Sequence, residues 1–163
     1  NIIDAKESFG RLNINSNKTV NLEWVSANPT KPLHSGHGRQ ICLGKAIANM
    51  LEWSGYKVTR EYYYNDAGNQ MNILAQSIYA RYMQLFDADF PFPENGYQGE
   101  YIKDIAKEIY DESADKYKNS NSLDYFRKRG EEYNFKLIQK TLNRLGIFQD
   151  VRENPFQIAY LVS

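Results

Sequence analysis

Two prolines and two histidines separate a strand-like run from a long helix-like run, and this arrangement restricts the fold more than any other feature of the chain. Val20, Leu22 and Trp24 alternate with polar residues, which is the period-two pattern of a half-buried strand. Pro29 and Pro32 prevent that strand from continuing. Apolar residues at helical spacing follow. A strand that leads through a short loop into a helix indicates the start of an α/β unit.

The segment after the loop predicts a helix and then a second strand. Gly55 follows the last helical turn, where a left-handed cap is expected. Val58–Tyr64 then alternates as a strand. Strand, helix and strand over about 45 residues form one βαβ unit, which implies parallel pairing and a right-handed crossover. The apolar stripe expected on this helix comprises Leu43, Ala46, Ile47, Met50 and Leu51.

The remainder of the chain predicts three further helices. Asn65 or Asp66 can cap the first of them, and residues 87–99, rich in proline and glycine, form the clearest internal boundary. The expected apolar faces are Met71, Leu74, Ala75, Ile78, Tyr82 and Phe86; then Ile102, Ile105, Ala106 and Ile109; and then Leu123, Phe126, Tyr133, Leu137, Ile138, Leu142 and Leu145, closed by Gly146. Between the last two, residues 111–122 are expected to be a turn, and residues 147–163 carry no clear pattern.

The only two histidines of the chain, His34 and His37, flank Gly36 at the predicted helix start. Backbone N–H groups without partners and the positive end of a helix attract anions, so this is a phosphate-binding arrangement. Two alternatives are a zinc site and simple packing of both rings. Zinc is disfavoured because the chain has no other histidine and one cysteine, Cys42. The prolines, the glycine and the preceding strand disfavour simple packing.

Composition excludes several classes of protein. The 163 residues carry 20 basic and 20 acidic side chains, so no global basic field exists for nucleic acid. A single cysteine fits a reducing compartment, and no window is apolar enough to span a bilayer. The 13 tyrosines could stack on RNA bases, but packing of the ring with its hydroxyl near water is the stronger interpretation.

The run PLHSGHGR resembles the "HIGH" signature of class I aminoacyl-tRNA synthetases. The longer run EWVSANPTKPLHSGHGR, with REYYYNDAGNQ downstream, is similar to the arginyl-tRNA synthetase family in particular. The resemblance implies an α/β fold: the first half of a Rossmann-like (HUP-type) nucleotide-binding domain with a mainly helical insertion. It implies a linker over residues 1–18, the half-domain over 19–86 and the insertion over 87–163. Complete enzymes of the family are several times longer, so a fragment is expected.

The resemblance also implies roles for individual residues. The implied catalytic pair is His34 and His37. The implied ATP-binding residues are Pro32, His34, Gly36, His37 and Gly38, and the implied arginine-binding residues are Glu23, Ser26 and Asn28, although alternation alone would turn Glu23 toward solvent. The motif runs through Ala27, Asn28, Pro29, Thr30, Lys31, Pro32, Leu33, His34, Ser35, Gly36 and His37, with a second signature at Asp66, Gly68 and Gln70.

The implied reaction joins arginine to ATP as arginyl-adenylate and then transfers the arginyl group to tRNA(Arg). ATP is expected with Mg²⁺, without a protein-bound metal, in a cytoplasmic, non-membrane and monomeric full-length enzyme. The family's KMSK-type loop is absent, so the isolated chain is expected to be inactive. Two alternatives remain: another H-x-G-H nucleotidyltransferase, and a synthetase-like module that binds RNA or protein.

Overall fold

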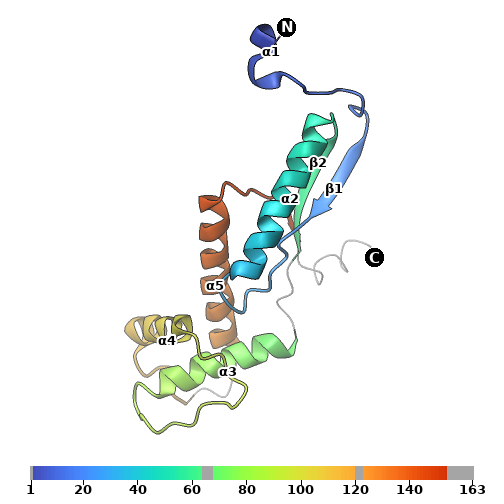
Figure 1. Cartoon of the computed structure of the whole chain (residues 1–163). Helices are drawn as coiled ribbons and strands as arrows, with labels where there is room; N and C mark the ends of the chain where they lie inside the picture. The colour runs from blue at the N-terminus through green and yellow to red at the C-terminus, as the bar shows by residue number, and fades with distance from the viewer. Residues whose placement is uncertain (1, 64–67, 120–122, 154–163) are drawn as a thin grey trace. The chain divides into compact units, whose positions relative to one another are not determined.

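The computed structural model describes residues 2–63, 68–119 and 123–153, which divide into two compact units (Figure 1). Unit 1 contains residues 1–27, 33–64 and 142–163, and unit 2 contains residues 28–32 and 65–141. The described elements are α1 (Ile2–Ala5), η1 (Lys6–Ser8), β1 (Thr19–Glu23), α2 (Ser35–Trp53), β2 (Lys57–Tyr63), α3 (Asn69–Met83), α4 (Glu100–Ser113), α5 (Asp124–Arg144) and β3 (Val151–Glu153).

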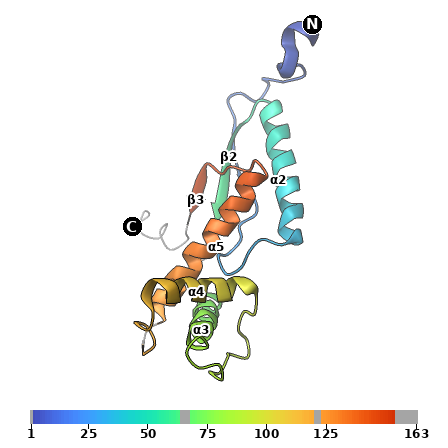
Figure 2. The ribbon, with the colours of Figure 1, turned by 90° about the vertical axis from the view of Figure 1, so that its left-hand side faces the viewer.

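Unit 1 is built on a small parallel sheet in the order β1-β2-β3. β1 pairs with β2 in a register that places Val20 opposite Val58, and β2 pairs with β3. The predicted adjacent parallel strands are therefore confirmed. α2 is the crossover between β1 and β2 and runs beside them (Figure 2). β3 pairs with the edge of β2 that faces away from β1. β3 falls in the tail for which the sequence pattern predicted no element.

The face of α2 that is buried differs from the predicted one. Leu43 and Met50 are each 60% exposed, whereas the buried residues of the helix are Ile41, Gly44 and Ala48. The reason is the ring of Trp24: a Cβ at Gly44 would lie 2.5 Å from its Cδ1 atom, so only glycine allows this approach. Gly44 and Ala48 therefore pack inward together with Ile41, whereas Leu43 and Met50 face outward.

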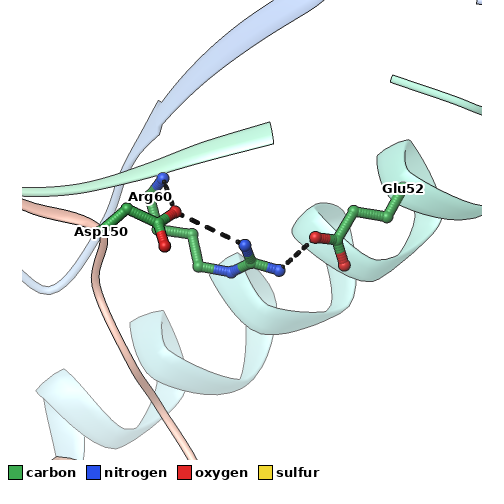
Figure 3. Close-up of polar contacts among 3 residues, drawn as sticks. All are labelled: Glu52, Arg60 and Asp150. Atoms are coloured by element: carbon green, nitrogen blue, oxygen red, sulfur yellow. Dashed lines mark hydrogen bonds and ion pairs between the residues drawn. The ribbon is translucent and has the colours of Figure 1, made fainter. Parts of the chain in front are cut away.

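An arginine on β2 joins three elements of unit 1 (Figure 3). Arg60 Nη2 lies 2.6 Å from Glu52 Oε1 on α2, and Nη1 lies 3.6 Å from Asp150 Oδ2, directly before β3. The backbone N–H of Arg60 donates to the same Asp150 oxygen at 2.8 Å, and the N–H of Asp150 donates to the Arg60 carbonyl at 2.8 Å. The hydrogen bond to Glu52 is the largest cause of the raised pKa of Arg60. Asp150 therefore fixes the register at which β3 meets β2.

The polar segment that precedes β1 packs against the C-terminal end of α2. The N–H of Leu12 donates to the Trp53 carbonyl at 2.7 Å, and Asn15 Nδ2 donates to the Ser54 carbonyl at 3.0 Å. Gly55 has φ of +93°, which confirms the predicted left-handed cap, and a Cβ there would lie 2.7 Å from the Leu12 carbonyl oxygen.

Unit 2 has its core between α3 and α4, with Phe126 of α5 fully buried in it. The predicted faces of α3 and α4 are confirmed in this core, except that Phe86 is only partly buried. α4 continues to Ser113, beyond the predicted start of the polar turn. On α5, Ile138 and Leu142 are buried as predicted, but Leu145, directly after the helix, is 54% exposed. α3 begins after Gly68, not after Asn65 or Asp66, which lie outside the described residues.

Close approach of α5 to α3 depends on a glycine within unit 2. A Cβ at Gly130 would lie 2.5 Å from Cδ1 of Ile78 and 3.0 Å from Cδ2 of Leu74.

Within the described ranges, no helix is both long enough and apolar enough to cross a membrane.

Candidate functional site

The chain turns sharply where β1 ends. Val25 has φ of +57°, a left-handed conformation that β-branched residues rarely adopt, and its side chain is 2% exposed. Its carbonyl accepts the N–H of Ala27 at 2.8 Å, which closes a three-residue turn. Strain of this kind persists only where neighbouring contacts hold it, and it is concentrated at functional sites.

Tyr62 of β2 supplies that holding contact. Its hydroxyl donates to the Ala27 carbonyl at 2.7 Å and accepts the Ala27 N–H at 3.3 Å, and its side chain is 1% exposed. Sequence reasoning placed Tyr62 on one face of a strand but missed this role, because the two residues are separated by 35 positions.

Glu23 is exposed at the end of β1, and Ser26 orients its carboxylate. The Ser26 hydroxyl donates to Glu23 Oε1 and accepts the backbone N–H of Tyr63 at 3.0 Å. An open cavity of about 440 Å³ lies beside them, within the range of roughly 300–1,000 Å³ typical of ligand pockets. Its lining includes Glu23, Trp24, Ser26, Gln40, Leu43 and Ile47.

The two histidines cap the start of α2 reciprocally. His34 is the N-cap residue, and its Nδ1 atom accepts the N–H of Gly36 at 3.2 Å. His37 Nδ1 accepts the backbone N–H of His34 at 3.2 Å, and the ring centroids lie 3.9 Å apart. Two N–H groups of the helix start are thereby satisfied by imidazole rings, in the manner of a capping box.

These contacts determine where the imidazole protons lie. A ring nitrogen that accepts a hydrogen bond carries no proton, so each neutral ring holds its proton on Nε2. The N–H donor that each neutral ring can offer to a phosphate is therefore a specific atom, Nε2 of His34 and of His37. Protonation of Nδ1 would end the capping bonds.

Asn28–Pro32, the middle of the motif, belongs to unit 2. Asn28 Nδ2 donates to Gln70 Oε1 at 3.4 Å, and the Tyr101 hydroxyl donates to the Thr30 carbonyl at 2.9 Å. Thr30 is 4% exposed, whereas Lys31 is exposed. The contact with Gln70 brings the two predicted signatures together, and the contact with Tyr101 was not predicted.

The other predicted residues lie along the same path. Pro32 and Leu33 are half-buried and Ser35 is exposed. Gly38 is half-buried, and a Cβ there would meet no atom within 4 Å. Gly68 has φ of +91° before α3, and Asp66 lies outside the described residues. Among the residues that the structure describes, no three His, Cys, Asp or Glu side chains converge to hold a metal ion.

Comparison with known families decides which kind of α/β protein this is. Residues 1–154 match the family model described as "tRNA synthetases class I (R), catalytic domain". The chain belongs to the class I arginyl-tRNA synthetase family. Curated relatives named arginine–tRNA ligase include one from Desulfotalea psychrophila, 49% identical over 149 residues, and one from Acinetobacter baumannii, 54% identical over 112 residues. The matched residues cover 91% and 69% of this chain, but only 27% and 19% of those relatives.

Two solved structures share the fold of this chain. A Campylobacter jejuni protein, described provisionally as an arginyl-tRNA synthetase, is 30% identical and has a TM-score of 0.84 over 94% of this chain and 34% of its own. The Thermus thermophilus arginyl-tRNA synthetase, 22% identical with a TM-score of 0.51, covers 85% of this chain and 24% of its own and shows a shared fold. The predicted Rossmann-like first half agrees with these catalytic-domain structures.

Proposed function

We propose that this chain supplies the ATP- and arginine-binding segment of a longer arginine–tRNA ligase, which forms arginyl-adenylate and then arginyl-tRNA(Arg). The observation that carries the proposal is the helix start at His34 and His37, where two imidazoles cap the helix through Nδ1. In a neutral ring this leaves Nε2 as the N–H donor. In this proposal ATP enters with Mg²⁺ on its phosphates.

The proposed chemistry of this segment is charge stabilisation and positioning. Attack of the arginine carboxylate on the α-phosphate expels pyrophosphate and concentrates negative charge on phosphate oxygens. Nε2–H groups and the positive end of α2 stabilise that charge, with Pro32, Gly36 and Gly38 shaping the backbone around it. Each lost transition-state donor typically costs about a hundred- to a thousandfold in rate.

The cavity beside β1 is the proposed arginine site. Glu23 offers a carboxylate to the planar guanidinium, since fork-shaped donors pair with two carboxylate oxygens. Ser26, whose hydroxyl contacts Glu23 and the Tyr63 backbone, acts mainly by orienting that carboxylate. Asn28 is assigned to the amino-acid end of arginine, and the second signature, Asp66, Gly68 and Gln70, is assigned to the active site of the same enzyme.

The remaining assignments follow from the same proposal. Residues 1–18 serve as a linker, 19–86 as the first nucleotide-binding half and 87–163 as the insertion. The full-length enzyme acts as a monomer in the cytoplasm, and the isolated chain lacks the complete activity.

The deciding experiment is ATP–pyrophosphate exchange with the full-length protein that carries this segment, with and without tRNA(Arg). The expected result is exchange that depends on arginine, requires tRNA(Arg) and is not supported by citrulline or lysine. Exchange with an unrelated small acid and no need for tRNA would instead indicate another H-x-G-H nucleotidyltransferase. A folded protein that binds RNA but exchanges nothing would indicate a binding module.

A further inference from the structure

The motif segment Asn28–Pro32 is held by side chains of unit 2. Pro29 is fully buried and Thr30 is 4% exposed. The Thr30 N–H donates to the Asn28 carbonyl at 2.8 Å, so the two residues are joined by a tight turn around Pro29. The Thr30 carbonyl accepts the Tyr101 hydroxyl at 2.9 Å, across 71 positions of sequence. A shift of Thr30 would therefore move Asn28 as well.

The position of Tyr101 at the start of α4 depends on a neighbouring glycine. A Cβ at Gly99, the N-cap residue of α4, would lie 2.6 Å from Cδ1 of the Tyr101 ring. The ring therefore occupies the space that any other side chain at position 99 would fill. Burial raises the pKa of Tyr101 to about 12, so its hydroxyl stays protonated, and hence a donor, well above neutral pH.

We propose that Tyr101 is a positioning residue for arginine binding: its hydroxyl fixes the Thr30 carbonyl and thereby the turn that carries Asn28. The inference rests on the proposed function, in which Asn28 holds the amino-acid end of arginine. It assigns a role in the arginine site to a residue of the helical insertion. Tyr101 touches neither arginine nor ATP in this proposal and acts only through the segment.

The chemical consequence is a selective loss of arginine affinity. A single neutral hydrogen bond contributes about 1 kcal/mol, which corresponds to about a fivefold change in an equilibrium constant. The ring packing survives when only the hydroxyl is removed. Asn28 contacts arginine equally in the ground and transition states, so its misplacement raises KM and leaves kcat nearly unchanged.

The test compares Tyr101→Phe with the matched control Tyr110→Phe in the full-length protein. Tyr110 lies on the same helix, and its ring packs against Phe86 with centroids 5.3 Å apart. Tyr101→Phe is expected to raise the arginine KM about fivefold, with unchanged kcat and unchanged KM for ATP. Tyr110→Phe is expected to change none of these. An unaltered arginine KM in folded Tyr101→Phe overturns the proposal.

Amide hydrogen exchange provides a second readout that does not depend on turnover. In the full-length protein, the Thr30 amide is expected to exchange about fivefold faster in Tyr101→Phe and at the parent rate in Tyr110→Phe. Faster exchange without a change in arginine KM would reduce Tyr101 to a structural role and overturn the proposal. Failure of the proposed function itself is distinguishable, because it would appear as absent arginine-dependent exchange of pyrophosphate in the unmodified protein.

Discussion

His37 Nδ1 accepts the backbone N–H of His34 at 3.2 Å, while His34 Nδ1 accepts the N–H of Gly36 at the same distance. The two imidazoles therefore have a structural function on one ring edge and, in the proposed reaction, a chemical function on the other. Because these functions use different nitrogen atoms, substitutions can separate them.

Replacing His37 by asparagine is predicted to preserve the helix start and to remove the proposed donor. The asparagine carbonyl oxygen can accept the His34 N–H as Nδ1 does, but nothing takes the place of Nε2–H. Arginine activation in the full-length protein should fall about a hundred- to a thousandfold, while thermal stability stays near that of the parent. His37→Ala should lose both arginine activation and thermal stability. Pyrophosphate exchange and thermal unfolding measure the two effects, and normal turnover in folded His37→Asn would contradict the assignment.

Glu23→Gln is predicted to weaken arginine use mainly through KM and to narrow the preference for arginine over citrulline. A neutral amide no longer favours the guanidinium cation over the uncharged analogue. The matched control is Glu61→Gln, because Glu61 is paired with Glu23 in the sheet register and bonds to Asn21. It should leave arginine kinetics unchanged. If the arginine kinetics of Glu23→Gln match those of the parent, the Glu23 carboxylate does not bind arginine.

Asn134→Leu is predicted to stabilise unit 2. Asn134 of α5 is 0% exposed, and neither its Nδ2 nor its Oδ1 atom has a hydrogen-bond partner among the residues that the structure describes. An unsatisfied buried amide costs about 1–3 kcal/mol, and leucine has similar size without polar atoms. Asn143→Leu, at an exposed position on the same helix, should show only the smaller gain from helix propensity. Urea denaturation measures the free energy of unfolding of each variant. A lower free energy of unfolding in Asn134→Leu than in the parent would contradict the prediction.

Gly44→Ala is predicted to destabilise unit 1 by about 1–3 kcal/mol through overpacking against Trp24. The new methyl group would lie 2.5 Å from the Trp24 Cδ1 atom, and the ring has to move. In Gly38→Ala, on the same helix, the new methyl group meets no side chain of the described residues within 4 Å, so this variant should gain up to about 1 kcal/mol from helix propensity. We expect Gly44→Ala to lower the midpoint temperature of thermal unfolding and Gly38→Ala to raise it. An unchanged midpoint in Gly44→Ala would show that the Trp24 ring is mobile.

Stability is predicted to fall between pH 10 and about 12 because of Tyr101. Burial raises its folded-state pKa to about 12 from the ordinary 10, so the folded state retains the proton that the unfolded state loses. The stabilisation is complete below pH 10 and is lost as the pH rises through the folded pKa. Alkaline unfolding curves of the chain and of Tyr101→Phe measure the contribution, and the variant should lose this part of the pH dependence.

Local periodicity predicted the elements that depend on neighbours in sequence. Alternation identified β1 and β2, and the faces of α3 and α4 followed from helical spacing. α2 shows the limit of such reasoning. Two stripes of this helix have helical spacing, and the choice between them depends on Trp24 packing over Gly44, which residue spacing does not encode.

Some features of the candidate site were predictable from neighbouring residues in the sequence, and others were not. The helix start at His34 follows from proline, glycine and histidine positions within a few residues. The contacts of Tyr62 with Ala27 and of Tyr101 with Thr30 join residues 35 and 71 positions apart. β3 is only three residues long, too short for a period to be visible. Each depends on tertiary pairing, which one sequence does not reveal.

The contact between Arg60 and Asp150 has a consequence for the order of folding. The two residues are 90 positions apart, whereas β1 and β2 are joined by one helix. The entropic cost of closing a loop rises with its length, so distant pairings form later than near ones. We expect β1, α2 and β2 to assemble first. β3 is expected to pair with β2 only after the helices between them in the sequence have formed and packed. In this order Asp150 marks the last step, and truncation before it would leave a kinetically early intermediate.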